Sequence, residues 1–396
     1  MSELPPSDVQ SCNSTTQNLA EPIRYIPADG KEKVEGGMAL CLSGGGYRAM
    51  LFHTGVLLRL NDLTILSGLK RISSVSGGSI TSGVLATRWK YLKFEAGRAT
   101  NLEELLVGPI RNLASRTIDW PSVILGLLWF GGVGGRIANQ YRKYLFGEAT
   151  LQDIPSNPRF IFNATGVQSG VLCRFSQPYM WDYRIGKIEQ PKIPLAIAIA
   201  ASSAFPPFLS PMTIDLKNST FVKDSGTDLD AAKFQERLVL TDGGVYDNLG
   251  VETAWKRFDT ILVSDAGGSY EAEASPHRDW GRHTLRTLFT IDNQVRSLRR
   301  RQIVGAFRAK PPIKKGSFWS IASDFSTGFG VPSPLPCPIQ QTEELAKVST
   351  RLGRLPDELQ MRLINWGYAA CDISVRKFLL TAASPPLAFP YPKVGV

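Results

Sequence analysis

Arg71-Ile-Ser-Ser-Val-Ser-Gly-Gly-Ser-Ile80 decides the fold, because it joins an apolar run to a helical pattern through a very short turn. Ser76 stands at the turn, with Ser74 two residues before it and Gly78 two residues after it. This is the small-x-Ser-x-Gly form of a nucleophile elbow, in which a tight strand-to-helix turn exposes a serine hydroxyl at the edge of a sheet. Ordinary loops also contain such residues, so the interpretation depends on the rest of the chain.

Length and composition describe an ordinary globular chain. The 396 residues are 43% hydrophobic and 20% charged, enough to bury the core of one large α/β domain or of several smaller ones. Five scattered cysteines without a Cys-x-x-Cys pair argue for a reducing compartment and against a disulfide framework or zinc site. Residues 1–21 are polar and contain no signal-peptide core, so we expect a cytoplasmic protein with peripheral contact to a membrane.

No apolar run reaches the ~18 residues that a membrane-spanning helix needs. The nearest candidate is the stretch 121–135, which is rich in glycine and carries Trp129 and Phe130. It is typical either of a buried helix followed by a loop or of a lid that touches lipid.

Two consecutive strand–loop–helix units open the ordered part of the chain. The short apolar run Met38–Leu42 leads into Ser43-Gly-Gly-Gly-Tyr-Arg-Ala49 and then into a helical pattern that continues to Leu63. The turn at Ser76 follows, with a helical pattern over 80–92. Two such units in succession predict a parallel sheet with crossover helices.

The remaining pattern extends this α/β plan along the chain. It predicts a polar leader over 1–35, a catalytic domain over 36–308, and a loop plus C-terminal helical extension, packed on the same domain, over 309–396. Within the last part, residues 309–339 are rich in proline, glycine and serine and are expected to form a loop. The pattern also predicts strands at 158–164, 171–175, 237–240 and 260–263, and helices at 194–204, 282–307 and 356–380.

The glycine-rich turn Gly44, Gly45, Gly46 opens the first helix. Such a turn presents backbone N–H groups at a helix N-terminus, where they can hold a phosphate or a developing oxyanion. The spacing matches neither a P-loop nor a dinucleotide-binding turn, so the oxyanion interpretation is favoured. Neighbouring turns of a parallel sheet meet at one edge, which places this loop beside Ser76. Arg48 either adds positive charge there or forms an ordinary ion pair.

A serine nucleophile needs a base, and the residues leave its identity open. Asp242 and Asp265 each follow a predicted strand and precede glycines. The chain has only three histidines. His53 falls within a predicted helix, and we expect it to have a structural role. His277 and His283 follow Asp242, so the order Ser–Asp–His of an α/β-hydrolase triad is formally available.

Four motifs in this order resemble the patatin-like phospholipase family. They are Gly44-Gly-Gly-Tyr-Arg48, Ser74-x-Ser76-x-Gly78, Ala201-Ser-Ser-Ala-Phe-Pro206 and Asp242-Gly-Gly-Val245. The resemblance covers residues 38–268, well over half of the chain. Ser74 replaces the usual first glycine of the elbow, and Ala49 stands where the glycine loop often has another glycine. Both replacements are small residues, so they affect the expected geometry and reaction rate of the site more than the resemblance to the family.

The resemblance implies a single patatin-like α/β domain with a mainly parallel central sheet flanked by helices. It also implies hydrolysis of lipid acyl esters by a Ser76–Asp242 dyad without histidine and without cofactor or metal. Gly44, Gly45, Gly46 and Arg48 then surround the oxyanion. If Asp242 is partly desolvated beside Ser76, its pKa rises and it becomes a better base. Asp265 becomes structural, and the Asp265→Ala variant should keep activity if it folds.

The formal charge of +10 comes almost entirely from residues 282–315, which hold ten lysines and arginines and one acidic residue. Their densest part includes Arg296, Arg299, Arg300 and Arg301. Basic residues near an anionic lipid surface contribute about 1 kcal/mol each, so contact with a phospholipid membrane is one interpretation. The other is a solvated helix face whose arginines pair with acids elsewhere. No nucleic-acid recognition motif accompanies the charge, and we expect no nucleic-acid partner.

The leading hypothesis is therefore a hydrolase of phospholipid or lysophospholipid acyl esters. The alternatives are an α/β-hydrolase-type esterase that uses His277 or His283, and a non-catalytic membrane-binding protein on the same fold.

Overall fold

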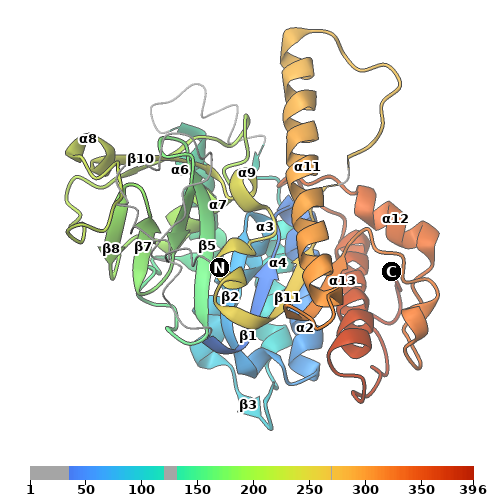
Figure 1. The fold of residues 1–396 in the computed structure, drawn as a ribbon. Helices are drawn as coiled ribbons and strands as arrows, with labels where there is room; N and C mark the ends of the chain where they lie inside the picture. The colour runs from blue at the N-terminus through green and yellow to red at the C-terminus, as the bar shows by residue number, and fades with distance from the viewer. Residues whose placement is uncertain (1–34, 120–131, 269) are drawn as a thin grey trace, which may run out of the picture. The chain divides into compact units, whose positions relative to one another are not determined.

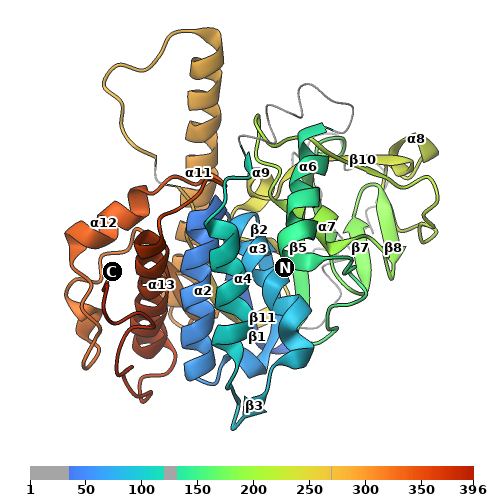
Figure 2. The same cartoon turned by 180° about the vertical axis from the view of Figure 1, so that it is seen from behind.

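The computed structural model describes residues 35–119, 132–268 and 270–396. The predicted leader and most of the apolar stretch 121–135 lie outside the described residues. Val34–Val396 form one compact unit, whose ten-stranded sheet carries helices on both faces (Figures 1 and 2). This confirms the α/β fold, the central and mostly parallel sheet, and the C-terminal helices.

The parallel half of the sheet holds the predicted site. Its strand order is β12-β11-β1-β2-β5, and all four neighbouring pairs are parallel. These strands are β1 (Glu35–Leu42), β2 (Leu69–Val75), β5 (Arg159–Gly166), β11 (Phe258–Asp265) and β12 (Lys315–Ser320). Side chains alternate along a strand, so Leu40 joins the core beneath α2 while Cys41 joins the smaller core on the opposite face.

The other half of the sheet is antiparallel. Three short strands continue from β5 as a meander, namely β6 (Leu172–Phe175), β7 (Tyr179–Asp182) and β8 (Gly186–Glu189). Two further strands, β9 (Met212–Asp215) and β10 (Arg237–Asp242), pair with each other, and the end of β10 pairs with β5. Two small strands, β3 (Phe94–Glu95) and β4 (Arg98–Ala99), form a separate pair.

The pairing of β10 with β5 explains how Asp242 reaches the elbow. Val75, the last residue of β2, lies opposite Asn163 on β5. Asp242, the last residue of β10, lies opposite Ala164, the next residue along β5. Because β6 occupies the other edge of β5 over the same residues, β2 and β10 share one edge and meet end to end.

Helices cover the two faces of the sheet. The larger core lies beneath a set that includes α2 (Gly46–Asp62), α3 (Gly77–Arg88), α4 (Leu102–Ala114), α6 (Gly132–Tyr141) and α7 (Leu195–Ser202). The smaller core on the opposite face includes residues of α10 (Glu252–Trp255) and α11 (Trp280–Arg308). Two four-residue helices, α8 (Ala232–Gln235) and α9 (Gly244–Asp247), flank β10.

The C-terminal part is integrated into the same domain. The expectation of a loop over 309–339 is wrong for residues 315–320, because they form β12 and extend the sheet beside β11. Periodicity could not show this, since the strand is short and lies among prolines and glycines. After α12 (Ile339–Lys347), the last helix α13 (Asp357–Phe378) packs along α2, with Trp366 edge-on to Phe52.

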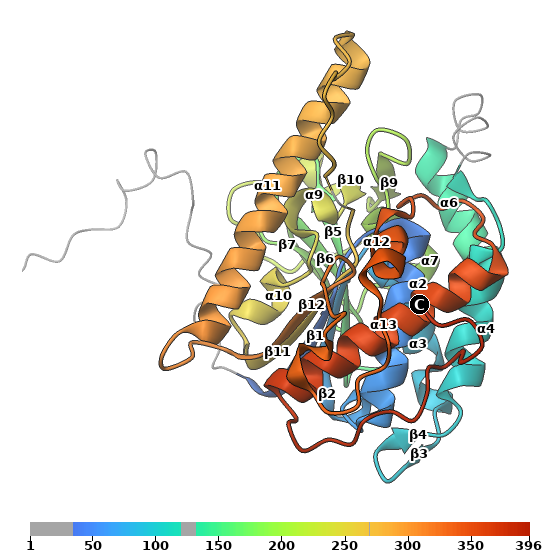
Figure 3. The same ribbon diagram turned by 90° about the vertical axis from the view of Figure 1, so that its right-hand side faces the viewer.

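Helix α11 is the longest described element. It begins at Trp280, where the Asp279 side chain caps it by accepting a hydrogen bond from the Arg282 N–H at 3.0 Å. It then runs for 29 residues to Arg308, as the spacing over 282–307 predicts. Its first turns project beyond the other helices and strands (Figures 1 and 3). No helix within the described ranges is both long enough and apolar enough to cross a membrane.

Candidate active site

Ser76 occupies a strained turn between β2 and α3. Its φ of 51° and ψ of −119° are unusual for a residue with a side chain, and such a conformation costs about 1–3 kcal/mol. The Ser76 N–H donates a hydrogen bond to Ser202 Oγ at 3.0 Å, which helps to hold the turn. Gly77 is required there, because a Cβ at this position would lie 2.1 Å from the Gly46 carbonyl oxygen. The turn has the geometry that the sequence predicts for an elbow.

Ser202 is a contributor that reasoning from the sequence missed. Its hydroxyl accepts the hydrogen bond from the Ser76 N–H and itself donates to the Asn163 carbonyl at 2.7 Å. It also lies 2.8 Å from Ser79 Oγ. The available signal was the motif Ala201–Pro206, which the sequence marks as a unit without assigning a role to its serine. Ser202 thus links the elbow to β5.

The glycine loop lies directly beside Ser76. A Cβ on Gly44 would lie 3.1 Å from Ser76 Cβ and 2.4 Å from Asn248 Oδ1. The Gly44 N–H already donates to the Asn248 carbonyl at 3.1 Å. Gly45 and Gly46 both have positive φ; Gly45 is the N-cap of α2 and Gly46 is its first residue, where helix N–H groups have no partner within the helix. The two turns therefore meet at one edge of the sheet, as predicted from the parallel topology.

Asp242 is buried at the same edge. Its N–H donates to the Ala204 carbonyl at 2.9 Å, and its Oδ1 accepts the Gly244 N–H at 2.7 Å. Its Oδ2 is buried without a hydrogen-bond partner among the described residues. Burial raises the pKa of Asp242 to about 7, although the Gly244 N–H and the nearby Ser76 hydroxyl act to lower it. A buried carboxylate with one free oxygen beside a serine hydroxyl has the features of a general base.

Comparison with known proteins identifies the family. A family model described as "Patatin-like phospholipase" matches residues 40–255, more than half of the chain. The chain belongs to the patatin-like phospholipase family. A curated relative, a patatin-like phospholipase domain-containing protein of Coccidioides immitis (strain RS), is 26% identical over 185 residues. These residues cover 46% of the chain but only 23% of that relative.

Solved structures show a more distant similarity to this patatin-like chain. Human GIVD cytosolic phospholipase A2 in complex with methyl gamma-linolenyl fluorophosphonate is 15% identical, with a TM-score of 0.47 over 85% of this chain and 56% of that one. VipD from Legionella pneumophila is 14% identical, with a TM-score of 0.35 over 85% of this chain and 65% of that one.

Arg48 of the patatin-like glycine motif binds backbone carbonyl groups. Its guanidinium donates to Ala346 at 2.6 Å, to Val348 at 2.8 Å and to Ala266 at 2.9 Å. Burial lowers its pKa to about 10. The side chain thereby ties the start of α2 to the C-terminal end of α12 and to the residue that follows β11.

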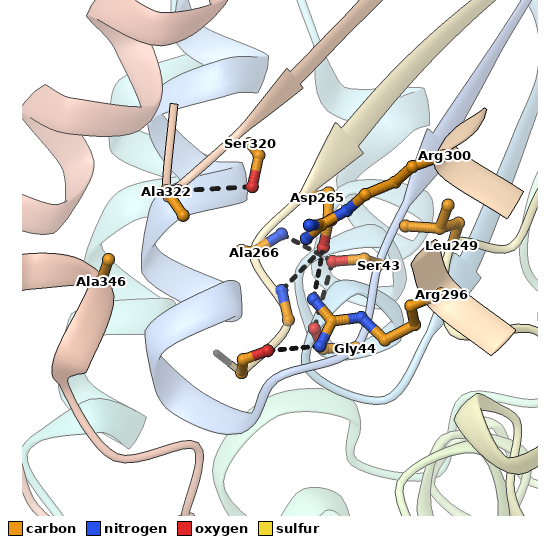
Figure 4. A network of polar contacts seen from close by, with 12 residues as sticks. Ser43, Gly44, Leu249, Asp265, Ala266, Arg296, Arg300, Ser320, Ala322 and Ala346 are labelled. Carbon is orange, nitrogen blue, oxygen red and sulfur yellow. Dashed lines mark hydrogen bonds and ion pairs between the residues drawn. The ribbon is translucent and has the colours of Figure 1, made fainter. Parts of the chain in front are cut away.

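Asp265, the second candidate base, is paired with arginines. Arg296 and Arg300 of α11 converge on its carboxylate, close to Ser43 and Gly44 (Figure 4). The Gly267 N–H also donates to Asp265 Oδ1 at 3.0 Å. Burial acts to raise the pKa of Asp265, but the two guanidinium charges outweigh it and the pKa falls to about 2. Both carboxylate oxygens are engaged, which fits a structural role.

The histidines lie apart from this arrangement. His53 is buried, with Nδ1 3.0 Å from Ser264 Oγ and Nε2 3.0 Å from the Ser43 carbonyl oxygen. Burial lowers its pKa to about 4, so it is neutral and bridges the ends of β1 and β11. His277 and His283 are exposed near the start of α11. Within the described residues, neither forms a hydrogen bond with Ser76 or Asp242.

The four arginines proposed to contact anionic lipid mostly have intramolecular partners. Arg296 and Arg300 pair with Asp265, and Arg299 pairs with Glu252 at 3.0 Å. For these three the alternative interpretation is confirmed: the arginines pair with acids elsewhere in the fold. Arg301 is exposed and forms no ion pair within the described part of the chain. No cluster of His, Cys, Asp and Glu side chains in the same part could hold a metal ion.

Replacing Asp265 by asparagine is expected to destabilise the domain by about 3–5 kcal/mol, because it leaves the buried guanidinium of Arg296 and the partly buried one of Arg300 without their counter-ion. The pKa of this carboxyl lies near 2 in the folded state and near 3.8 otherwise, so its contribution is present above pH about 4 and is lost as the pH falls towards 2. Urea unfolding at pH 7, followed by circular dichroism, measures the effect.

Glu252→Gln is the matched control for Asp265→Asn. Glu252 also forms an ion pair with an arginine of α11, Arg299, but this pair is more accessible to solvent than the pair of Arg296 with Asp265. Its loss should therefore cost at most about 1 kcal/mol. Equal losses in the two variants would show that burial does not distinguish the pairs.

Proposed function

We propose that this chain hydrolyses fatty-acyl ester bonds of phospholipids or lysophospholipids, with Ser76 as nucleophile and Asp242 as base. The observation that carries the proposal is the buried, unpartnered Oδ2 of Asp242 beside the strained Ser76 turn. Membership of the patatin-like phospholipase family supports the lipid ester as substrate. The experiment that tests it is reaction of Ser76 with a fluorophosphonate probe, because only an activated serine attacks phosphorus.

The reaction proceeds in two halves. In the first, Asp242 accepts the proton of the Ser76 hydroxyl as Ser76 Oγ attacks the acyl carbonyl carbon. The tetrahedral intermediate collapses, the ester C–O bond breaks, and the departing alcohol takes the proton from Asp242. In the second half, Asp242 accepts a proton from water as the water oxygen attacks the acyl carbonyl carbon. The bond between that carbon and Ser76 Oγ then breaks, Ser76 Oγ takes the proton back from Asp242, and the fatty acid leaves. The raised pKa of Asp242 suits both directions of proton transfer near neutral pH.

The oxyanion of each tetrahedral intermediate needs preorganised donors. The N–H groups of Gly45 and Gly46 at the start of α2, and of Gly77 at the start of α3, supply them in the proposal. Gly44 contributes chiefly space, since its N–H is bound to the Asn248 carbonyl and its lack of a side chain lets the loop approach Ser76. Arg48 holds the loop in place through its three carbonyl contacts.

Activity is expected to rise with pH through about 7, because the proposed base acts only as the carboxylate and its pKa is raised to about 7. The ratio kcat/KM for a soluble short-chain ester, measured from about pH 5 to about pH 9, gives the profile without interference from lipid packing. A flat profile across this range would contradict the assignment of Asp242.

The two alternatives predict different outcomes. A Ser–Asp–His triad requires His277 or His283, and the double replacement of both by alanine would then abolish turnover; we expect it to be retained, because both rings are exposed and unconnected to Asp242. A non-catalytic membrane-binding protein on this fold would show no fluorophosphonate labelling of Ser76. No described contact favours either alternative over the dyad.

A further inference from the structure

Helix α11 carries an exposed apolar stripe. Trp280, Leu288, Ile291 and Leu298 are 86%, 49%, 55% and 58% exposed. Successive members of this stripe are eight, three and seven residues apart, which places them on one side of the helix, with Val295 between the last two. A run of large apolar side chains at this spacing normally marks a buried face, so its exposure calls for a partner.

The stripe lies beyond the edge of the sheet that holds Ser76 and Asp242. β11 ends at that edge, and α11 returns from beyond it towards β12, which runs parallel to β11. The first turns of α11 accordingly project beyond the same edge of the sheet at which α9, the helix that follows Asp242, is found (Figures 1 and 3). The stripe and the proposed catalytic residues therefore share one side of the domain.

Direct contacts connect α11 to the site. Phe289, next to Leu288, stacks on Phe205 with ring centroids 6.2 Å apart and an interplanar angle of 10°. Phe205 follows Ala204, whose carbonyl accepts the N–H of Asp242. One turn along α11, Asp292 contributes to the raised pKa of Asp242. The helix that carries the stripe is thus a wall of the site.

Further apolar side chains surround the same place. Phe208 and Val245 are both about half exposed; Phe208 lies in the segment after Ala204, and Val245 lies in α9, which follows Asp242. Together with Phe205 they form an apolar rim on the side of α11 that carries Phe289, whereas the stripe lies on another face of the same helix.

The charges of the first turns of α11 and of the segment before it balance one another. Residues 271–286 contain three arginines and three carboxylates, namely Arg278, Arg282, Arg286, Glu271, Glu273 and Asp279. Arg286 faces Glu273 at 3.6 Å and lies over the Tyr270 ring, while Arg282 faces Asp279 at 4.0 Å. Three arginines farther along the helix form ion pairs with acidic side chains of the domain, namely Arg296, Arg299 and Arg300. The exposed surface here is apolar and has little net charge. These properties match a partner surface that has no net charge of its own.

We propose that the stripe of α11 and the adjoining rim dock on a zwitterionic phospholipid surface and bring the Ser76 edge to it. This rests on the proposed function, which makes the substrate a lipid ester. Amphipathic helices bind such surfaces by inserting apolar side chains to the depth of the headgroups, and tryptophan at the tip is favoured at that boundary. Attraction here is apolar, unlike the arginine-driven contact that the charge count alone suggests.

The test measures co-sedimentation with phosphatidylcholine vesicles in the Ser76→Ala background, so that no lipid is consumed and the result does not depend on the dyad. Leu288→Asn/Ile291→Asn is expected to weaken partitioning at least about tenfold, since binding scales with the apolar area inserted. Trp280→Ser should weaken it as well. Ile313→Asn/Leu387→Asn is the matched control, because these residues are at least as exposed but lie outside α11.

The salt dependence of vesicle binding and the oligomeric state of the protein distinguish the possible partners of this surface, namely zwitterionic lipid, anionic lipid and a second copy of the chain. Raising the ionic strength from about 0.1 M to about 1 M, which shortens the Debye length from about 10 to about 3 Å, should leave binding nearly unchanged. Binding that needs anionic lipid and is lost in high salt would overturn the proposal, as would equal binding by the stripe variant and its control. A dimer that light scattering detects and the stripe variant dissociates would assign the face to a second copy. Failure of the proposed function would appear separately, as absence of fatty-acid release by the unmodified chain.

Discussion

Ser76→Ala is expected to lower fatty-acid release from phospholipid vesicles by roughly 10⁴-fold or more, because it removes the atom that forms the covalent acyl intermediate. The variant should fold, since the hydrogen bond that holds the turn uses the Ser76 backbone N–H and not its hydroxyl. Release of labelled fatty acid and fluorophosphonate labelling, located by peptide mass, measure the effect. Both signals should disappear together.

Ser82→Ala is the matched control, because Ser82 lies on α3, the helix that begins directly after Ser76. The Ser82 hydroxyl is buried and has no hydrogen-bond partner within the described residues, so its removal should change neither activity nor stability appreciably. Fatty-acid release by Ser76→Ala at a rate comparable with Ser82→Ala would remove Ser76 from the mechanism. Labelling of the chain at another serine would point to a different nucleophile.

Asp242→Asn is expected to reduce turnover by about 10²–10⁴-fold, the range that general-base catalysis typically contributes. Asparagine can still accept the Gly244 N–H hydrogen bond, but it cannot take the proton of Ser76. The same change should raise the free energy of unfolding at pH 8. The carboxyl titrates near 3.8 when unfolded and near 7 when folded, so ionising it costs stability as the pH rises through this interval, and asparagine avoids that cost.

The opposite movement of rate and stability distinguishes a catalytic carboxylate from a structural one. Asp182→Asn serves as control: this carboxyl is also buried with a raised pKa, but it lies on β7, three strands from β2, and binds Ser169. Asp182→Asn should keep turnover, which would show that removing a buried carboxylate does not by itself lower the rate. An Asp242→Asn variant that works within about tenfold of the unmodified chain would place the base elsewhere.

The elbow and the glycine loop were predictable because their geometry is encoded locally. Small residues on both sides of Ser76 permit the positive φ and the close approach of strand and helix. Parallel strands in sequence order bring their following turns to one edge, which places Gly44–Gly46 beside Ser76 without knowledge of the remaining fold. Ser202 was missed because its hydroxyl acts through a backbone N–H more than one hundred residues away in the chain.

The two aspartates show where local pattern ends. Asp242 and Asp265 both close a strand before glycines, and composition could not separate them. In the structure, Asp265 receives Arg296 and Arg300 from α11, 31 and 35 residues later, which hold its pKa near 2. Asp242 receives no cation and meets Ser76 only because β10 enters antiparallel along the edge of β5 where β2 ends. Nothing within either motif specifies these pairings.

Contiguous motifs and regular periodicity were enough to predict the family, the α/β fold and the turn that carries Ser76. The three-dimensional contacts add that Asp265 is paired with arginines while one oxygen of Asp242 has no hydrogen-bond partner among the described residues. They also show that three of the four arginines of α11 are paired within the domain and that an apolar stripe of the same helix faces outwards. These properties depend on which distant elements meet. An ion pair or an exposed face is defined by its surroundings, which the order of residues along one helix does not contain.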